Sequence, residues 1–485
     1  MSREHAVRLS TGIDGLDEIL QGGLVPARSY MLRGGPGTGK TLVGLHFLVA
    51  GLRLGEPALL IGLGEPEREL RRNAAAVGLD VGKVQMLDLS PTSEFFTEAQ
   101  TYDIFSAVEV EREPTIRKIQ ERVEAVQPGR ILVDGMTQMR LLASDGFQFR
   151  KQILSFLRFL TDLGATVMFT SESTEHPDDD LQFLADGVIE MISLADGRYV
   201  RVVKYRGSDF RPGRHTVRIG DSGVEVFPRL VPEDYRRVFE QDRMPSGIPE
   251  LDQMLSGGIE RGTTTLITGP SGVGKSTLGV QFMKEAASRD ERCVVYIFEE
   301  WSDTLLRRCE SVNMPMQEML QRGTLSLVQV EPLRFTADQF ARMVRREVED
   351  NKARIVMIDS ISGYRLSLRG EDLVLHLHAL AKYLQNMGVT VLLINEVEAI
   401  TGDFRITEIG VSYMVDNIIF LRYLEVNGEI RKALGVLKKR LTDFEKRMRE
   451  VEITAEGFKV GEALSDLRGI LIGRPERILV RQKKT

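Results

Sequence analysis

The sequence GGPGTGKT at residues 34–41 and the sequence GPSGVGKS at residues 269–276 decide the fold of this chain. Each matches the pattern G-x-x-x-x-G-K-[S/T], follows an apolar, strand-like run and precedes a helix-like one. In such a loop the glycines let backbone N–H groups turn inward around phosphate oxygens, where a side chain would clash. Two matches in the same strand–loop–helix context predict two nucleotide-binding sites.

Each loop residue has a predicted role. Lys40 and Lys275 would reach the β- and γ-phosphates and take part in catalysis, and the hydroxyls of Thr41 and Ser276 would hold Mg²⁺. The predicted ligands are therefore ATP and Mg²⁺. The other predicted ATP-binding residues are Gly35, Pro36, Gly37, Thr38 and Gly39 in the first loop, and Pro270, Ser271, Gly272, Val273, Gly274 and Thr277 in the second.

The two loops belong to a longer repeat. TGIDGLD (11–17) returns as SGIPELD (246–252), and Gly22-Gly23 returns as Gly257-Gly258, both at an offset of 235 residues. The loop lysines share that offset. A period this long indicates duplicated domains rather than a solenoid. Two unrelated NTPase domains fused together would not preserve the segment that precedes the loop.

Short apolar runs alternate with helix-like segments in both halves. This alternation predicts an α/β fold with a mostly parallel twisted sheet flanked by helices in each half. A polar stretch at 232–243 reads as the linker, and we place the domains at 1–238 and 239–485. The expected later strands are 58–63, 84–89, 130–134, 165–171 and 187–194 in the first half, and 293–298, 324–330, 354–359, 390–396 and 417–424 in the second.

Composition is that of a globular protein, with 42% hydrophobic and 28% charged residues. Two cysteines cannot form a disulfide framework, and neither lies in a metal-ligand pattern. We find no signal peptide and no apolar stretch near the ~20 residues of a membrane span, so we expect a cytoplasmic protein without membrane contact. A net charge of −6 does not favour binding to nucleic acid.

An acidic residue ends one buried strand in each half. The runs RILVD and RIVMID end in Asp134 and Asp359. An acidic residue at the tip of such a strand completes a phosphate-loop site by fixing Mg²⁺ against the β- and γ-oxygens. The alternative is a helix N-cap, because Gly or Ser follows each aspartate.

Hydrolysis also needs a group that orients or deprotonates water. We expect the strand CVVYIF to lie beside the phosphate loop, so that its terminal Glu299 and Glu300 can reach an in-line water. At the same offset the first half has Gly64 and Glu65, which predicts tight binding with slow hydrolysis there, unless Glu65 substitutes. The alternative for all three glutamates is a solvated strand end.

A Lys-x-Arg pair follows a strand near the end of each half. The pairs are Lys204 with Arg206, and Lys438 with Arg440. Alternate spacing on a strand places the two cations of a pair on one face. We expect each pair to serve a neighbouring subunit's γ-phosphate as arginine fingers do. The alternative is the solvated face of an edge strand.

Together these features resemble the KaiC family of double-domain ATPases and autokinases. The resemblance covers nearly the whole chain and implies two tandem RecA-like P-loop domains in a two-tiered homo-hexamer, with ATP between subunits. It gives the general-base role to Glu299. It also implies an ATPase in the first domain, an autokinase in the second, and a role in timing or signalling.

The resemblance also implies phosphoacceptors in the second half. Ser412 matches the family's serine, Tyr413 stands where the family has threonine, and Thr407 matches a nearby hydroxyl that can take phosphate. The first-half counterparts, Gln182 and Phe183, have no hydroxyl. Alternatively, the hydroxyl pair only caps or packs the local backbone.

The expected partners follow from the same resemblance. They are KaiB-like proteins or signalling histidine kinases, but not a KaiA-type activator, because the chain stops at Thr485, short of the tail through which that activator acts. Two other hypotheses stay open. One is a DNA-dependent ATPase of the RecA, RadA or DnaB type, and the other is a nucleotide-gated scaffold without catalysis.

Overall fold

The structure is a computed structural model that describes residues 7–90, 109–142, 145–172, 181–331, 334–366, 368, 373–397, 411–470 and 476–477. Contacts within the chain divide it into two compact units, Met1–Arg229 and Leu230–Thr485. The boundary at residue 238 stays a prediction. From Leu230 onward the segment read as a linker packs on the second unit, where Leu230 is buried and Tyr235 meets the Tyr383 ring edge-on at 5.1 Å.

The first unit is built on one sheet with nine strands among its described residues, in the order β3-β2-β4-β5-β1-β6-β7-β8-β9. The strands from β3 to β6 pair in parallel, and β6 to β9 continue the sheet as antiparallel hairpins. The strands are β1 (Ser29–Gly34), β2 (Ala58–Gly62), β3 (Gln85–Asp88), β4 (Arg130–Asp134), β5 (Thr166–Glu172), β6 (Gly187–Leu194), β7 (Gly197–Tyr205), β8 (His215–Gly220) and β9 (Gly223–Phe227).

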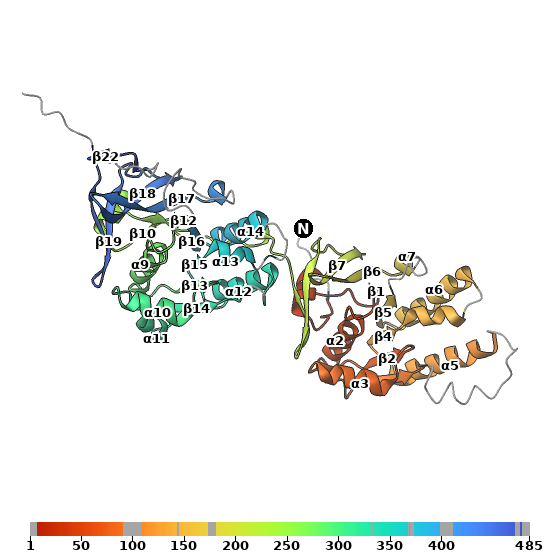
Figure 1. The fold of residues 1–485 in the computed structure, drawn as a ribbon. Coiled ribbons are helices and arrows are strands. Elements are labelled where there is room, and N and C mark those ends of the chain that lie inside the picture. The colour runs from red at the N-terminus through yellow and green to blue at the C-terminus, as the bar shows by residue number, and fades with distance from the viewer. Residues whose placement is uncertain are drawn as a thin grey trace, which may run out of the picture. The chain divides into compact units, whose positions relative to one another are not determined.

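Helices cover both faces of the parallel part of this sheet (Figure 1). Side chains of α2 and α3 belong to the core on one face, and side chains of α5 and α6 belong to the core on the other. The central strands are apolar on both faces for this reason. The helical elements are α1 (Asp14–Ile19), α2 (Lys40–Arg53), α3 (Glu67–Ala76), α5 (Glu109–Val126), η1 (Met136–Leu142), α6 (Gly146–Asp162) and α7 (Leu181–Leu184).

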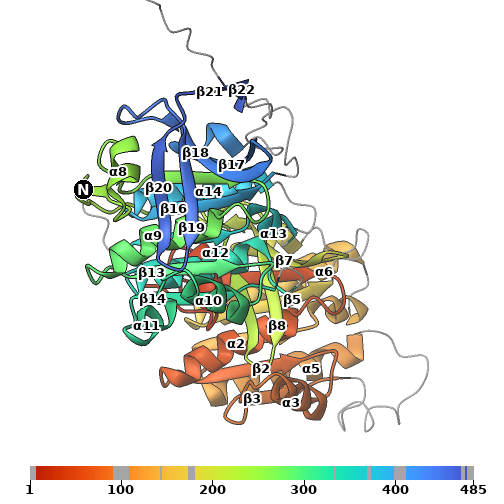
Figure 2. The ribbon, with the colours of Figure 1, turned by 60° about the vertical axis from the view of Figure 1, so that its left-hand side comes forward.

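The second unit repeats this architecture. Its large sheet has the order β14-β13-β15-β16-β12-β17-β18-β19-β20 within the described ranges, position for position the order of the first. The antiparallel strands β17 to β20 lie together in Figure 2. The strands are β10 (Arg243–Met244), β11 (Ile259–Glu260), β12 (Thr264–Gly269), β13 (Cys293–Ile297), β14 (Leu325–Gln329), β15 (Ile355–Asp359), β16 (Thr390–Glu396), β17 (Asn417–Val426), β18 (Glu429–Lys439), β19 (Arg449–Thr454), β20 (Gly457–Ala463), β21 (Leu467–Arg468) and β22 (Glu476–Arg477).

Helices again cover both faces of the parallel strands. In Figure 1, α9, α10 and α11 lie on one side of these strands, and α12, α13 and α14 lie on the other. The predicted fold class, two tandem domains with mostly parallel sheets flanked by helices, is confirmed. The helical elements are η2 (Pro232–Asp234), α8 (Pro249–Met254), α9 (Lys275–Ala287), α10 (Ser302–Glu310), α11 (Met316–Gln321), α12 (Ala337–Glu349), α13 (Ile361–Leu366), α14 (Leu373–Asn386) and η3 (Val411–Tyr413).

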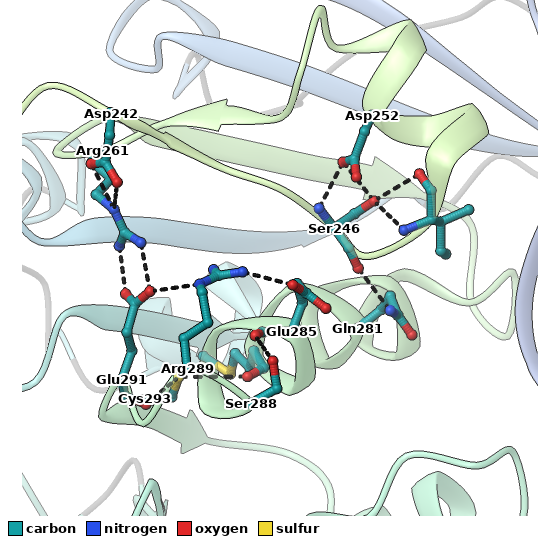
Figure 3. Close-up of polar contacts among 12 residues, drawn as sticks. Asp242, Ser246, Asp252, Arg261, Gln281, Glu285, Ser288, Arg289, Glu291 and Cys293 are labelled. Carbon is teal, nitrogen blue, oxygen red and sulfur yellow. Dashed lines mark hydrogen bonds and ion pairs between the residues drawn. The ribbon is translucent and has the colours of Figure 1, made fainter.

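The repeated segment ahead of each phosphate loop is a turn closed by its aspartate. Asp252 accepts hydrogen bonds from the Ser246 backbone N–H at 2.7 Å and from the Ser246 hydroxyl at 2.8 Å (Figure 3). Asp17 binds the backbone and hydroxyl of Thr11 in the same way, at 2.8 and 2.7 Å. The side chain thus satisfies the backbone of the turn, which explains why the segment keeps its Ser or Thr and its Asp.

A buried arginine fixes the start of the second unit. Arg261 pairs with both oxygens of Glu291 at 2.6 Å and also binds Asp242, and Arg289 binds Glu291 from the other side (Figure 3). The Arg261 side chain is only 6% exposed, so both partners are needed to compensate its burial.

None of the described helices is long and apolar enough to cross a membrane.

Candidate active sites

Both phosphate loops have the geometry that their glycines predict. Gly37 and Gly39 have φ of 70° and 97°, and Gly272 and Gly274 have φ of 72° and 114°. This left-handed region strongly favours glycine. A Cβ on Gly274 would also lie 2.3 Å from the end of the Ile453 side chain, so a larger residue would have to displace that side chain in addition to straining the backbone.

The loop lysines fold back over the loops. Lys40 Nζ donates to the carbonyls of Gly34 and Gly35 at 2.8 and 2.9 Å. Lys275 Nζ donates to the carbonyl of Pro270 at 2.8 Å. Burial lowers the pKa of both lysines, and nearby carboxylates oppose the change. Each ammonium is therefore held at its loop among acceptors.

A buried aspartate meets the hydroxyl that follows the first loop lysine. Thr41 donates to Asp134 at 3.2 Å, and Thr170 donates to the same carboxylate oxygen at 2.7 Å. Burial raises the pKa of Asp134, and the hydrogen bonds from Thr170 and Thr41 and the charge of Lys40 oppose this rise. The predicted metal residues of the first site, Thr41 and Asp134, lie together.

The second site has the same arrangement. Burial raises the pKa of Asp359, and a hydrogen bond from Ser276 opposes that rise, as do the charges of Arg308 and Lys275. A hydroxyl beside a buried carboxylate fits Mg²⁺, which uses few protein ligands together with phosphate oxygens and water. Among the described residues no group of three or more His, Cys, Asp or Glu side chains could hold a metal.

From the sequence we expected the strand that ends before Glu299 to lie beside the phosphate-loop strand. In the structure it does not. Two strands, β15 and β16, separate β13 from β12. That expectation was wrong because sheet order differs from chain order. Glu299 instead follows the strand that pairs with the metal-site strand, with Ile297 opposite Asp359.

Glu299 nevertheless lies within reach of the site's charges. Burial raises its pKa, a hydrogen bond from Ser360 lowers it, Glu396 and Asp359 raise it, and Lys275 lowers it. Gly363 makes room for this arrangement, because a Cβ there would lie 2.3 Å from Phe298 and 3.2 Å from Glu299.

The sheet register supports the correspondence between Gly64 and Glu299. Gly62 lies opposite Asp134 in the first sheet as Ile297 lies opposite Asp359 in the second. Gly64 comes two residues after Gly62, and Glu299 comes two residues after Ile297. The first site thus has no side chain where the second has a carboxylate.

The other two predicted glutamates have partners on the following helix. Glu300 accepts from Arg308 at 2.7 Å, and Glu65 accepts from Asn73 at 3.4 Å. Burial raises the pKa of Glu65, and the negative charges of Asp134 and Glu69 raise it further. Glu65 therefore lies close enough to Asp134 to sense its charge.

Sequence reasoning missed a carboxylate in each site. Glu172 and Glu396 end the strands that flank the phosphate-loop strands, opposite Gly34 and Gly269. Glu396 lies 3.9 Å from Lys275 Nζ. The signal was present, since an acidic residue ends each of these apolar runs, but only the strand order identifies them as neighbours of the loop.

The family model described as "ATPase: KaiC" matches residues 9–231 and again residues 244–465. The chain belongs to the KaiC family. The resemblance drawn from the sequence is thereby confirmed.

Curated relatives match this chain along nearly its full length. "Circadian clock oscillator protein KaiC" of Parasynechococcus marenigrum is 27% identical over 487 residues, covering 97% of this chain and 93% of that protein. The protein of the same name from Synechococcus elongatus is 27% identical over 492 residues, covering 98% and 93%. These matches support an ATP-binding KaiC-type ATPase.

In this KaiC-family chain each Lys-x-Arg pair lies at the end of β7 or β18 and contacts the segment that precedes the paired strand, β6 or β17. Lys438 Nζ donates to the carbonyls of Ser412 and Val415 at 2.9 and 2.7 Å. Arg440 donates to the carbonyl of Tyr413 at 2.6 Å and lies 3.5 Å from Asp416. A role toward a neighbouring subunit's phosphate stays a prediction.

The first unit repeats these contacts at the matching positions. Lys204 Nζ donates to the carbonyls of Gln182 and Ala185 at 2.9 and 2.7 Å, and Arg206 lies 3.8 Å from Asp186. In both units the pair therefore fixes the backbone of one short segment. The lysine bonds to Gln182 and Ser412 support the alignment of these two positions.

The predicted acceptor hydroxyls lie in this segment of the second unit. Ser412 and Tyr413 are in η3, where Ser412 is half-buried and the Tyr413 side chain is 60% exposed. Phe183, at the matching place in the first unit, is also exposed. Thr407 lies outside the described residues.

Proposed function

We propose that both sites bind ATP with Mg²⁺ and that the second site hydrolyses ATP. The observation that carries this proposal is the hydroxyl–carboxylate pair next to each phosphate loop, Thr41 with Asp134 and Ser276 with Asp359. These residues would hold Mg²⁺, which neutralises phosphate charge when bound. The loop N–H groups and the lysine would bind the phosphates.

In the second site Glu299 acts as the general base. It takes a proton from water as the water oxygen bonds to the γ-phosphorus, while the bond from that phosphorus to the β–γ bridging oxygen breaks and ADP leaves. The raised pKa of Glu299 suits a base that must gain a proton. Ser360 orients the carboxylate through its hydrogen bond.

The second unit also transfers phosphate to itself. The hydroxyl oxygen of Ser412, or of Tyr413, bonds to the γ-phosphorus of ATP held by a neighbouring subunit, its proton passes to a carboxylate, and ADP leaves. The exposure of Tyr413 and the anchoring of this segment by Lys438 and Arg440 support the proposal. Membership of the KaiC family supports it too.

Transfer between subunits requires a homo-oligomer, and we propose a hexamer with ATP at its interfaces. The cations Lys204, Arg206, Lys438 and Arg440 would exchange part of their present contacts for a neighbour's γ-phosphate. The assembly would serve as a timing or signalling hub, read by KaiB-like proteins or histidine kinases. Relatives named as clock oscillator proteins support this part of the proposal.

One experiment tests the proposal as a whole. The full chain is incubated with Mg-ATP, and phosphate release, intact mass and particle size are followed together. We expect phosphate release, a mass increase by whole phosphoryl groups, and a larger particle with nucleotide than without it. Phosphate release without a mass increase would support ATP hydrolysis and contradict autophosphorylation. Release that depends on added DNA would favour a RecA-type motor instead.

A further inference from the structure

The two sites differ at one more matched position. Counting from Gly62 and Ile297, which face the metal-site aspartates, Glu65 and Glu300 hold the same place. Eight residues after each glutamate, on α3 or α10, the chain has Asn73 or Arg308. Each glutamate contacts its own helix residue, so the structure keeps the pairing while the partner's charge changes.

In the second site the partner is a cation. Arg308 Nη2 lies 2.7 Å from Glu300 Oε2, a short charge-assisted hydrogen bond. The positive charge of Arg308 also acts on Asp359 and Lys275. Glu300 is therefore committed to an ion pair, and Glu299 is the strand-end carboxylate left to face Ser360 and Lys275.

In the first site the partner is neutral. Asn73 Nδ2 lies 3.4 Å from Glu65 Oε2, at the long limit of a hydrogen bond. Arg71, on the same helix, instead binds Glu67 and the carbonyl of Val81, both at 2.8 Å. Among the residues that the structure describes, the groups that act on Glu65 are Asn73, Asp134 and Glu69, and none of these is a cation.

We infer that the helix residue selects which strand-end carboxylate works. Arg308 is a positioning residue that binds Glu300 and leaves the reaction of the second site to Glu299. Asn73 leaves Glu65 free to accept the proton from water in the first site, where Gly64 has no side chain. This inference rests on the proposed hydrolysis and deepens it for the first site.

The chemistry of the first site then matches that of the second. Glu65 gains the proton of the attacking water, the water oxygen bonds to the γ-phosphorus, and ADP leaves with the β–γ bridging oxygen. Burial raises the pKa of Glu65, and the negative charges of Asp134 and Glu69 raise it further, which makes Glu65 a better proton acceptor.

The test gives the first site the arginine that the second site has at the matching position. The full chain carries Lys275→Ala, so that turnover reports the first site, and Asn73→Arg is added. Asn73 is exposed, so the longer side chain can be accommodated. We expect kcat to fall by about tenfold or more, with little change in KM, because a general base contributes roughly 10²–10⁴-fold. Ala75→Arg adds the same charge at an exposed position that faces another side of α3, and should change neither constant.

A double variant separates positioning from damage. Gly64→Glu combined with Asn73→Arg gives the first site the arrangement of the second, with a free carboxylate and a paired one. We expect this chain to recover the turnover that Asn73→Arg alone loses. The reciprocal change tests the second site: in a Lys40→Ala, Glu299→Gln chain, Arg308→Asn should restore part of the lost turnover, because Glu300 is then released from its ion pair, and Arg308→Lys should restore less.

The outcomes are distinct. Unchanged first-site turnover in Asn73→Arg would overturn the inference, and so would a loss that Gly64→Glu does not recover. ATP bound at the first site without any turnover in the Lys275→Ala chain would overturn the role of Glu65 alone. Failure of the unaltered protein to bind ATP in calorimetry would overturn the proposed function itself.

Discussion

The Thr41 hydroxyl donates a hydrogen bond to the Asp134 carboxylate across 3.2 Å, although 93 residues separate them in the chain. The contact joins the first residues of α2 to the last residue of β4. Two strands that are distant in sequence order, β1 and β4, must be correctly placed for it to form. The contact therefore places both predicted metal residues at one point beside the phosphate loop.

Replacing one loop lysine should weaken ATP binding at its own site and leave the other site unchanged. We expect the unaltered chain to bind two ATP molecules with Mg²⁺ and each of Lys40→Ala and Lys275→Ala to bind one, measured by calorimetry. Charge-assisted hydrogen bonds contribute about 1.5–3 kcal/mol, so affinity at the altered site should fall roughly 10–100-fold. Lys284→Ala is the control, because Lys284 lies on α9 but binds the carbonyl of Asn313. Two sites of full affinity in Lys275→Ala would contradict the role of that lysine.

Chelating Mg²⁺ should weaken ATP binding at both sites. Asp134 and Asp359 are buried carboxylates whose pKa is raised by burial, so their negative charge is poorly compensated near the phosphates. Without the metal, these charges repel the nucleotide. We expect ATP to raise the melting temperature clearly with Mg²⁺ and much less with a chelator present, as ligand linkage requires. Equal stabilisation by ATP under both conditions would contradict the assignment of these aspartates to a metal site.

Glu299→Gln should abolish turnover at the second site without abolishing binding. We expect kcat in a Lys40→Ala chain to fall about 10²–10⁴-fold, the usual contribution of a general base. In the parent chain, burial raises the pKa of Glu299 above its ordinary value of 4.5, and the base must be ionised to work. Turnover should therefore fall as pH decreases through that raised pKa. Turnover that survives in Glu299→Gln would favour a different base or a non-catalytic scaffold.

The sequence predicted much of this site because the motif residues are local. The loop glycines, Lys40 and Thr41 lie within one short segment whose geometry the pattern dictates. The internal repeat added the matched position of Gly64 and Glu299, and the sheet register agrees with it. These predictions needed only the order of residues in the sequence and the expectation that functional residues follow the ends of buried strands.

Other features depend on sheet order, which sequence does not state. The adjacency assumed for β13 and β12 was wrong, and Glu396, on the true neighbouring strand, was overlooked for the same reason. The contact between Arg308 and Glu300 requires the turn from β13 into α10 to bring the two side chains together. The polar segment after Leu230 looked like a linker because its packing residues are few and widely spaced.

Gly64→Glu should accelerate hydrolysis at the first site. A Cβ at this position would meet no atom of the described residues within 4 Å, and its backbone is outside the left-handed region, so the start of a glutamate side chain has room there. In a Lys275→Ala chain we expect kcat to rise by about tenfold or more, since a second carboxylate becomes available to the water. Gly64→Gln has the same shape without the charge and should give no gain. A similar rise in both variants would point to packing rather than base catalysis.

The acceptor assignment is tested by locating the phosphate. After incubation with Mg-ATP, we expect peptide mass spectra to place most of the phosphate on Ser412, and Ser412→Ala to remove it while ATP hydrolysis continues. Tyr413→Phe keeps the ring and removes only the hydroxyl, so any phosphate that it loses belonged to the tyrosine. The first unit should stay unlabelled, because Gln182 and Phe183 hold the matching positions. Phosphate that persists in the Ser412→Ala, Tyr413→Phe double variant would move the acceptor elsewhere, with Thr407 as the first position to examine.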